Sequence, residues 1–407
     1  MHNLGERCFR RHFSILESFT LHLPAHAEDV YYFLNVSFRS TERQTPDSDE
    51  HIIPNSIGGR LVIKGFLCRK CNSETGDKWD VELSKQLNLF CLLLGGISRD
   101  RGFTPNEVFS TISGREVMLA NEGVMSIARP QYTTEEIDGK IHVSFTTGNM
   151  KQAQQFVRDF CRKHPSLNQQ DLMDNLVLSK TYLGGDALTF NPNFGGANSG
   201  RSLVKTILAF ATKVGIDPFL CNKAADYLLN DGKPCYGYYY SNDLVINRAF
   251  KKPAHCIAVH AEPNSGYVIG YLEYFGVWRV ISLLSDCYNG EEIKESYYIY
   301  PEDSKSGSFE IDLPLNIEVI TASYNYEKYD EVVFRDAFSF FLDYCQKKDL
   351  EREQNTIITQ AWNNALEKTG LKEGDEWSEE KILEFSKHIA NSVHPFLMNQ
   401  LLKGRKR

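Results

Sequence analysis

The pattern of apolar and polar residues in the first quarter of the chain predicts two strands followed by a helix. Aromatic and β-branched residues, which favour strands, are concentrated at 30–38 and again near 61–66. A polar loop and the turn signal Gly58-Gly59 separate these two segments. Residues 72–95 show the spacing of an amphipathic helix, with apolar positions at Trp79, Leu83, Leu87 and Phe90. The order strand, turn, strand, helix is therefore expected.

The middle of the chain has a less regular pattern. Short strands are predicted around 116–119 and 140–145, and a polar helix over 150–180. The segment 183–200 is rich in Gly and Asn and predicts a loop, and apolar positions at helical spacing predict a helix over 202–214. We expect a mixed α+β arrangement in this part.

The last part of the chain changes from strands to helices. Tyr- and Val-rich runs separated by turn residues predict an antiparallel meander over 235–324. Tyrosines in these runs are more typical of a sheet core than of base stacking. Helical patterns follow over 329–349, 355–369 and 378–402, and Ser378 suits the N-cap of the last. The fold class expected for the whole chain is α+β.

Composition restricts the class of protein. The chain has 407 residues, 42% of them hydrophobic and 24% charged, which is typical of a globular protein with two or three domains. It contains no apolar run of about 18 residues, and its first residues lack the apolar core of a signal peptide. We therefore expect a cytoplasmic protein that does not span a membrane and whose cysteines are mostly reduced thiols.

The net charge of −8 excludes nucleic-acid binding by overall charge, so such binding needs a local basic patch. One segment meets this condition, because no Asp or Glu occurs from His51 to Ser73. The basic residues in or just after this segment are Arg60, Lys64, Arg69, Lys70 and Lys78. Lys78 would either contact a phosphate or lie on a solvated helix face.

The same segment contains residues suited to phosphodiester hydrolysis. A neutral imidazole such as His51 can remove a proton from water. A carboxylate and an amide oxygen, as in Glu50 and Asn72, are hard ligands for a divalent cation. Asn72 at the start of the predicted helix would face the hairpin, and the helix N-terminus favours an anion. Helix capping is the alternative role for Asn72.

The order of these residues resembles a known superfamily. Glu50 to Pro54 read E-H-I-I-P, Gly58-Gly59 follow, and Cys68 to Asn72 read C-x-x-C-N, with Gly76-x-Lys78 and then Asp80. Over about residues 45–100 the chain resembles the HNH nucleases, which have a ββα-metal core. The resemblance implies a metal-dependent endonuclease in which His51 is the general base. Glu50 and Asn72 would bind Mg²⁺ or another divalent cation, and Asp80 is more typical of a structural role.

Two features depart from the family pattern. Relatives often have an upstream C-x-x-C that completes a zinc site with the later pair, here Cys68 and Cys71, and this chain lacks it. Zinc needs four ligands, which leaves Cys8 with His12, or His22 with His26, as substitutes. Packing of the two cysteines under the hairpin, without Zn²⁺, is the alternative. Ile63 also stands where many relatives carry a bracing Asn.

A second motif lies just before the helix at 202–214. Residues 195–202 loosely match a phosphate-binding loop, with Arg201 in place of its lysine. A flexible loop that opens a helix is the simpler interpretation. Contact of Arg201 and Lys205 with DNA phosphates is an intermediate one.

These observations lead to one functional hypothesis and two alternatives. We expect an HNH nuclease module at 1–95, a mixed α+β regulatory or substrate-recognition domain at 96–328 and a helical region at 329–407. The hypothesis is a DNA endonuclease, and the resemblance alone implies a bacterial restriction or anti-phage role. The alternatives are a nuclease that cleaves RNA or needs a protein or small-molecule activator, and a non-catalytic nucleic-acid-binding module. A homodimer would supply two modules for double-strand cleavage.

Overall fold

The computed structural model describes residues 48–100, 102–137, 140–147, 150–165, 167–174, 187–190, 193–230, 232–314, 316–372, 374 and 376–405. The strand predicted at 30–38 lies outside these residues. So do Cys8, His12, His22 and His26, the proposed substitutes for zinc ligands.

The N-terminal part of the described chain is the predicted hairpin followed by helices. Strand β1 (Asp49–His51) pairs antiparallel with β2 (Val62–Lys64), and the short helix η2 (Asn55–Ile57) lies between them. Four helical pieces follow in place of one helix: α3 (Arg69–Thr75), the π-helical turn η3 (Gly76–Asp80), α4 (Val81–Gln86) and α5 (Asn88–Leu94). Within the described residues the order is strand, turn, strand and helices, but the first strand is β1 and not the strand predicted at 30–38, which these residues do not test.

The turn between the two strands depends on glycine. A Cβ atom on Gly59 would lie 1.8 Å from the carbonyl oxygen of Ile53, and Gly58 has φ of 97°. A side chain at either position would collide with its neighbours or strain the backbone. The two glycines thus allow the chain to return directly from the E-H-I-I-P segment into β2.

The largest sheet has six strands: β9 (Tyr236–Tyr238), β10 (His255–Glu262), β11 (Tyr267–Tyr274), β12 (Trp278–Ser285), β13 (Ile293–Ile299) and β14 (Ser306–Gly307). Their spatial order is β14-β13-β10-β11-β12-β9, all antiparallel. The meander prediction is correct for β10 to β12 only. Because β13 returns to pair with β10, the four strands β13-β10-β11-β12 form a Greek key.

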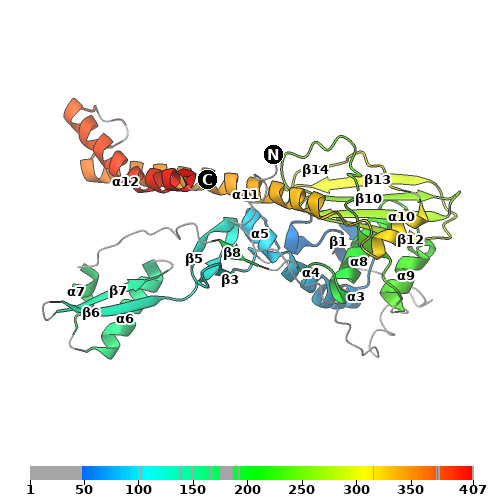
Figure 1. The fold of residues 1–407 in the computed structure, drawn as a ribbon, viewed down its shortest axis with the longest axis horizontal. Helices are drawn as coiled ribbons and strands as arrows, with labels where there is room; N and C mark the ends of the chain where they lie inside the picture. The colour runs from blue at the N-terminus through cyan, green and yellow to red at the C-terminus, as the bar shows by residue number, and fades with distance from the viewer. Residues whose placement is uncertain are drawn as a thin grey trace.

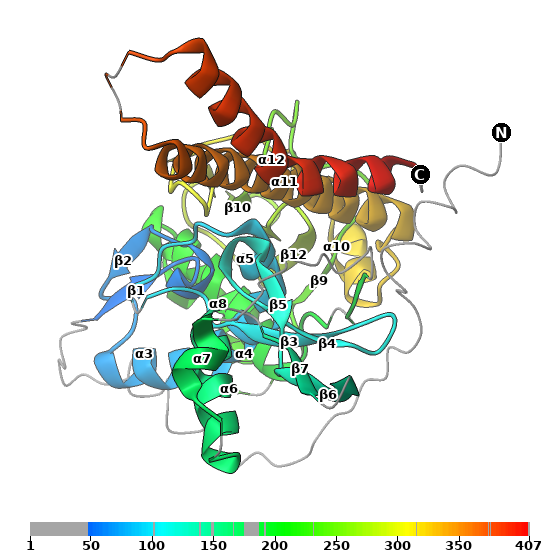
Figure 2. The same ribbon diagram turned by 90° about the vertical axis from the view of Figure 1, so that its left-hand side faces the viewer.

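Both faces of this sheet are covered (Figures 1 and 2). Helices α8 (Ala197–Lys213) and α9 (Asn222–Leu229) and the N-terminal module pack on one face, and α10 (Ile317–Tyr324) packs on the other. A Cβ atom on Gly270 would lie 2.0 Å from a methyl group of Ile207, so α8 approaches the sheet closely there. Helix α10 falls inside the segment where only strands were predicted.

A single apolar core joins the N-terminal module to the sheet and to the C-terminal part. The ring of Phe90 in α5 lies 4.9 Å from that of Phe341 and 5.6 Å from that of Phe275, measured between centroids. Leu83 and Leu87 are fully buried in the same cluster. Burial of this kind, at roughly 25 cal/mol per Å² of apolar surface, holds the three parts together.

The C-terminal part is a helical hairpin that extends from the body (Figure 1). Helix α11 (Glu331–Thr369) is continuous over 39 residues, although two helices were predicted there. The segment 350–354, Leu-Glu-Arg-Glu-Gln, contains good helix formers, so nothing ends the helix. Helix α12 (Glu379–Arg405) folds back on α11. Its cap at Ser378 is confirmed by the Lys381 N–H donating to Ser378 Oγ at 3.4 Å.

The middle region forms two smaller units. Strands β3 (Glu107–Thr111), β4 (Glu116–Leu119), β5 (Met125–Ile127) and β8 (Leu188–Thr189) form a sheet in the order β5-β4-β3-β8, with η4 (Asn121–Gly123) between β4 and β5. The hairpin of β6 (Gln131–Ile137) and β7 (Lys140–Thr146) packs on α6 (Met150–Lys163), followed by α7 (Gln169–Asp174). The predicted strands at 116–119 and 140–145 are confirmed. The chain is therefore mixed α+β, with antiparallel sheets and C-terminal helices.

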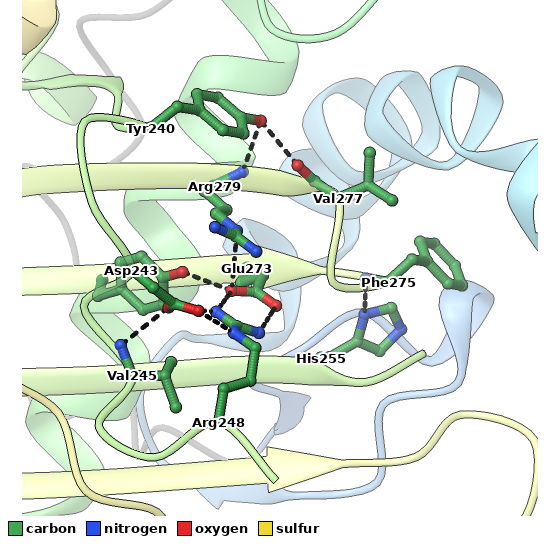
Figure 3. A network of polar contacts seen from close by, with 10 residues as sticks. Tyr240, Asp243, Val245, Arg248, His255, Glu273, Phe275, Val277 and Arg279 are labelled. Carbon is green, nitrogen blue, oxygen red and sulfur yellow. Dashed lines mark hydrogen bonds and ion pairs between the residues drawn. The ribbon is translucent and has the colours of Figure 1, made fainter. Parts of the chain in front are cut away.

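A buried charged cluster lies on the α10 face of the large sheet (Figure 3). The carboxylate of Glu273 is fully buried and accepts two hydrogen bonds of 2.8 Å from Arg248. Arg279 lies 3.4 Å from the same carboxylate, and Asp243 binds the far side of Arg248. Burial alone would raise the pKa of Glu273, but the two guanidinium groups lower it to about 2. Two cations therefore balance two carboxylates.

Candidate functional site

The three residues predicted to act together lie on the hairpin and the helix that follows it. Glu50 and His51 are neighbours on β1, and Asn72 lies in the first turn of α3. Because successive side chains on a strand point to opposite faces, Glu50 and His51 diverge. Glu50 is 5% exposed, whereas His51 is half-buried, with a side chain that is 29% exposed.

His51 lies beside a carboxylate that the motif does not include. Its Nε2 is 3.9 Å from Oδ2 of Asp100, and Asn55 holds Asp100 by two hydrogen bonds of 3.3 and 2.9 Å. Partial burial lowers the pKa of His51, and Asp100 opposes this shift. The imidazole is therefore neutral at neutral pH, as a general base requires, and it has a carboxylate nearby once it is protonated.

Arg60 lies on the same side of the hairpin and is already engaged with protein groups. It donates to the carbonyl of Ser98 at 2.6 Å and to Ser304 Oγ at 3.3 Å. Its Nη1 is also 3.8 Å from Oδ1 of Asp100. Arg60 thus joins the hairpin to two loops, in a place where sequence reasoning expected contact with the nucleic-acid backbone.

Asn72 contacts β1 through its side chain. Its Nδ2 donates to the carbonyl of Asp49 at 3.2 Å, which brings the amide against the strand that carries Glu50 and His51. The N-cap of α3 is Cys68, whose sulfur accepts from the Cys71 N–H at 3.3 Å. Capping is therefore not the role of Asn72.

Glu50 points in the opposite direction, into a buried cluster with α8. Lys205 Nζ is 2.6 Å from Glu50 Oε1 and 2.6 Å from Asp80 Oδ2, and Lys205 is 3% exposed. The other oxygen of Asp80 accepts a hydrogen bond of 2.6 Å from Ser202, one turn before Lys205. The interpretation that Lys205 touches DNA is wrong, because its ammonium is buried. The sequence motif gave no indication that Lys205 would pair with Glu50.

The charges of this cluster do not balance. Burial raises the pKa of Glu50, and Lys205 offsets the shift only in part, because Asp80 shares the same ammonium. Burial would lower the pKa of Lys205, but the two carboxylates raise it, so the lysine is charged. Two carboxylates therefore compete for one cation.

This arrangement determines how the predicted metal ligands fit a cation. A carboxylate and an amide oxygen are suitable donors for Mg²⁺. As arranged, however, Glu50 is bound to an ammonium and turned away from the face that carries His51, so Glu50 and Asn72 do not fit a shared cation. Within the described ranges, no three side chains of the types His, Cys, Asp and Glu gather as a metal site.

The cysteine pair predicted for zinc lies beneath the hairpin. The sulfur atoms of Cys68 and Cys71 are 3.0 Å apart, with Cys71 buried and Cys68 half-buried. No disulfide is present in the part of the chain that the structure covers. The upstream candidates for further ligands lie outside this part, so zinc binding stays a prediction.

The other basic residues of the predicted patch face solvent. Lys64 ends β2, Arg69 and Lys70 open α3, and Lys78 lies in η3, and all four are exposed. Arg201 instead lies over the ring of Tyr227 at 5.3 Å and donates to the Ala197 carbonyl of its own helix. These four exposed cations thus lie on β2, α3 and η3, where a phosphate backbone could reach them.

The hairpin is anchored to the large sheet by a buried histidine. Phe275 N–H donates to Nδ1 of His255 at 3.2 Å, so Nε2 carries the proton and donates to the carbonyl of Ile57 at 2.8 Å. Burial lowers the pKa of His255 to about 4. The neutral ring satisfies both contacts and fixes the segment that follows His51.

Comparison with known proteins finds a match in the N-terminal part of the chain. A family model described as HNH endonuclease matches residues 39–88. This range includes β1, β2 and the helices from α3 to α4. No curated protein and no solved structure matches the chain. None of the helices within the described residues combines the length and apolarity needed to cross a bilayer.

Proposed function

We propose that this chain is a DNA endonuclease. The premise is that it is an HNH superfamily member with a nuclease domain near its N-terminus. The observation that supports this most directly is His51, a neutral and partly exposed imidazole among solvent-facing cations. A nuclease must reach both a water molecule and a phosphate, and this face of the hairpin offers access to both.

In the proposed reaction, His51 removes a proton from the water that attacks phosphorus, and Asp100 stabilises the imidazolium that forms. The P–O bond to the 3′ oxygen breaks, and this oxygen leaves and takes a proton from solvent. Lys64, Arg69 and Lys70 bind the phosphate backbone on either side. HNH nucleases generally use divalent metal ions, and we propose that this one also depends on Mg²⁺ or a similar ion.

A cleavage assay tests this proposal. Supercoiled plasmid and a structured RNA are incubated with the protein, with Mg²⁺ or with EDTA. His51→Ala should slow DNA cleavage by about 10²- to 10⁴-fold, the usual contribution of a general base. The matched control is His394→Ala, at an exposed position on α12. Equal cleavage by the wild-type protein and His51→Ala would refute the assigned base.

Other outcomes of the same assay separate the alternatives. Loss of RNA alone identifies a ribonuclease, and cleavage that starts only after addition of cell lysate identifies an activator. Binding to DNA without cleavage under any metal identifies a non-catalytic module. Nicked plasmid indicates a single module, whereas linear plasmid indicates that two chains act together, as a homodimer would.

We also propose a role in restriction or anti-phage defence, which rests on the family resemblance. Bacteria that express the wild-type protein should form fewer phage plaques than bacteria that express His51→Ala. Equal plaque numbers would contradict this role without affecting the assignment of the nuclease. Elemental analysis of the purified protein for zinc tests the separate prediction for Cys68 and Cys71.

A further inference from the structure

Lys205 reaches the nuclease hairpin from outside the HNH domain. It lies on α8, more than a hundred residues after the matched segment, yet it is bonded to Glu50 on β1. Its burial and two contacts of 2.6 Å make it the main cationic partner of that carboxylate. Ser202 on the same helix fixes Asp80, so α8 supplies both groups that organise the cluster.

An ammonium and a divalent cation cannot both occupy Oε1 of Glu50. Mg²⁺ binds oxygen at roughly 2.0–2.1 Å, which is closer than the Lys205 contact. A cation on Glu50 Oε1 would therefore approach Lys205 Nζ closely, and the two like charges would repel in a site where little water screens them. Binding of the cation at Oε1 requires Lys205 to leave that oxygen.

The sharing of one ammonium favours competition over a permanent structural bond. Glu50 and Asp80 are both bonded to the ammonium of Lys205, at 2.6 Å each. If Lys205 left Glu50, it would still have Asp80 as a partner, so its departure would not leave a buried charge uncompensated.

We propose that Lys205 competes with a divalent cation for Glu50, so that a residue of α8 sets the cation affinity of the HNH site. The inference rests on the proposed function only in taking Glu50 as a cation ligand. Lys205 is then a positioning residue that acts through Glu50.

Cation binding without nucleic acid tests this inference. Mn²⁺ is titrated calorimetrically into the full chain as wild type, Lys205→Met and Lys213→Met. Lys213 is the matched control, because it is an exposed lysine at the end of the same helix. Lys205→Met should bind Mn²⁺ about tenfold more tightly or better, since loss of the ammonium removes the competitor. Lys213→Met should bind like the wild type.

If Lys205 were only structural, the Mn²⁺ titrations would give a different result. Its loss would leave Mn²⁺ affinity unchanged or weaker, and either result would overturn the inference. The double variant Glu50→Gln/Lys205→Met should bind Mn²⁺ no more tightly than the wild type. This result would show that the added affinity of Lys205→Met comes from Glu50. If Lys205→Met is unfolded without metal, Mn²⁺ should restore its folded circular dichroism spectrum, and failure to do so also counts against the inference.

The same titration separates this inference from the proposed function. Tight binding by Lys205→Met in a protein that cleaves nothing would refute the nuclease activity and keep the competition. Cleavage that needs His51, with equal Mn²⁺ affinity in Lys205→Met and wild type, would keep the nuclease and refute the competition.

Discussion

Two buried carboxylates in this protein have opposite surroundings. Glu273 in the large sheet is held by two guanidinium groups, and its pKa is lowered to about 2. Glu50 in the hairpin shares one ammonium with Asp80, and burial raises its pKa. The first cluster is balanced and stabilises the sheet. In the second cluster, two carboxylates share one ammonium.

The largest expected effect is on the balanced cluster. Glu273→Gln leaves the buried Arg279 and the partly buried Arg248 facing a neutral amide, and it should lower the free energy of unfolding by about 3–5 kcal/mol. Urea denaturation of the metal-free protein measures this change. Lys85→Gln removes one partner of an exposed ion pair on α4, and the denaturation midpoint should not move. A loss below about 1 kcal/mol for Glu273→Gln would remove the contrast between the clusters.

A smaller effect is expected from pH, and it should come from His255 and not from Glu273. The folded pKa of His255 is about 4 against an ordinary value of 6.5, so the unfolded chain binds more protons between these values. The free energy of unfolding should therefore fall by about 2 kcal/mol from about pH 8 to about pH 5. Glu273, with its lowered pKa, keeps its contribution until the pH falls below about 4.5.

His255→Gln serves as the control for this pH dependence. The variant should be less stable at every pH, but its stability should change less between about pH 8 and about pH 5, because the titrating group is gone. An unchanged slope of unfolding free energy against pH would show that another group is responsible.

The smallest effect is expected at Glu50. Glu50→Gln leaves Lys205 paired with Asp80, so no buried charge loses its last partner. Without metal, its free energy of unfolding should stay within about 1 kcal/mol of the wild type, measured by the same urea titration. A loss as large as that of Glu273→Gln would mean that Glu50 is primarily structural, and the contrast would disappear.

Local features of the fold were predictable from the sequence, and non-local ones were not. The hairpin follows from Gly58-Gly59 and the flanking β-branched residues, because the turn chemistry is local. The return of β13 to β10 was missed, since strand order depends on packing between distant segments. The continuity of α11 was missed because its polar stretch at 350–354 weakens the amphipathic pattern while favouring helix.

The candidate site shows the same division. The motif correctly predicted that Asn72 lies against the strand that carries Glu50 and His51, because spacing along a hairpin and a helix is a local property. Lys205 and Asp100 carried no such signal, because their contacts with Glu50 and His51 arise only from tertiary packing. The charged partners of Glu50 and His51 could therefore be identified only from the folded structure.

The shared apolar core has a consequence for protein engineering. The contacts of Phe90 with Phe275 and Phe341 mean that the nuclease module shares its apolar core with the rest of the protein and cannot be transferred alone. Cutting the chain after α5 would expose these side chains to water and remove Lys205, which is bonded to Glu50. A functional transplant or fusion has to carry α8, the large sheet and the first turns of α11 along with the hairpin.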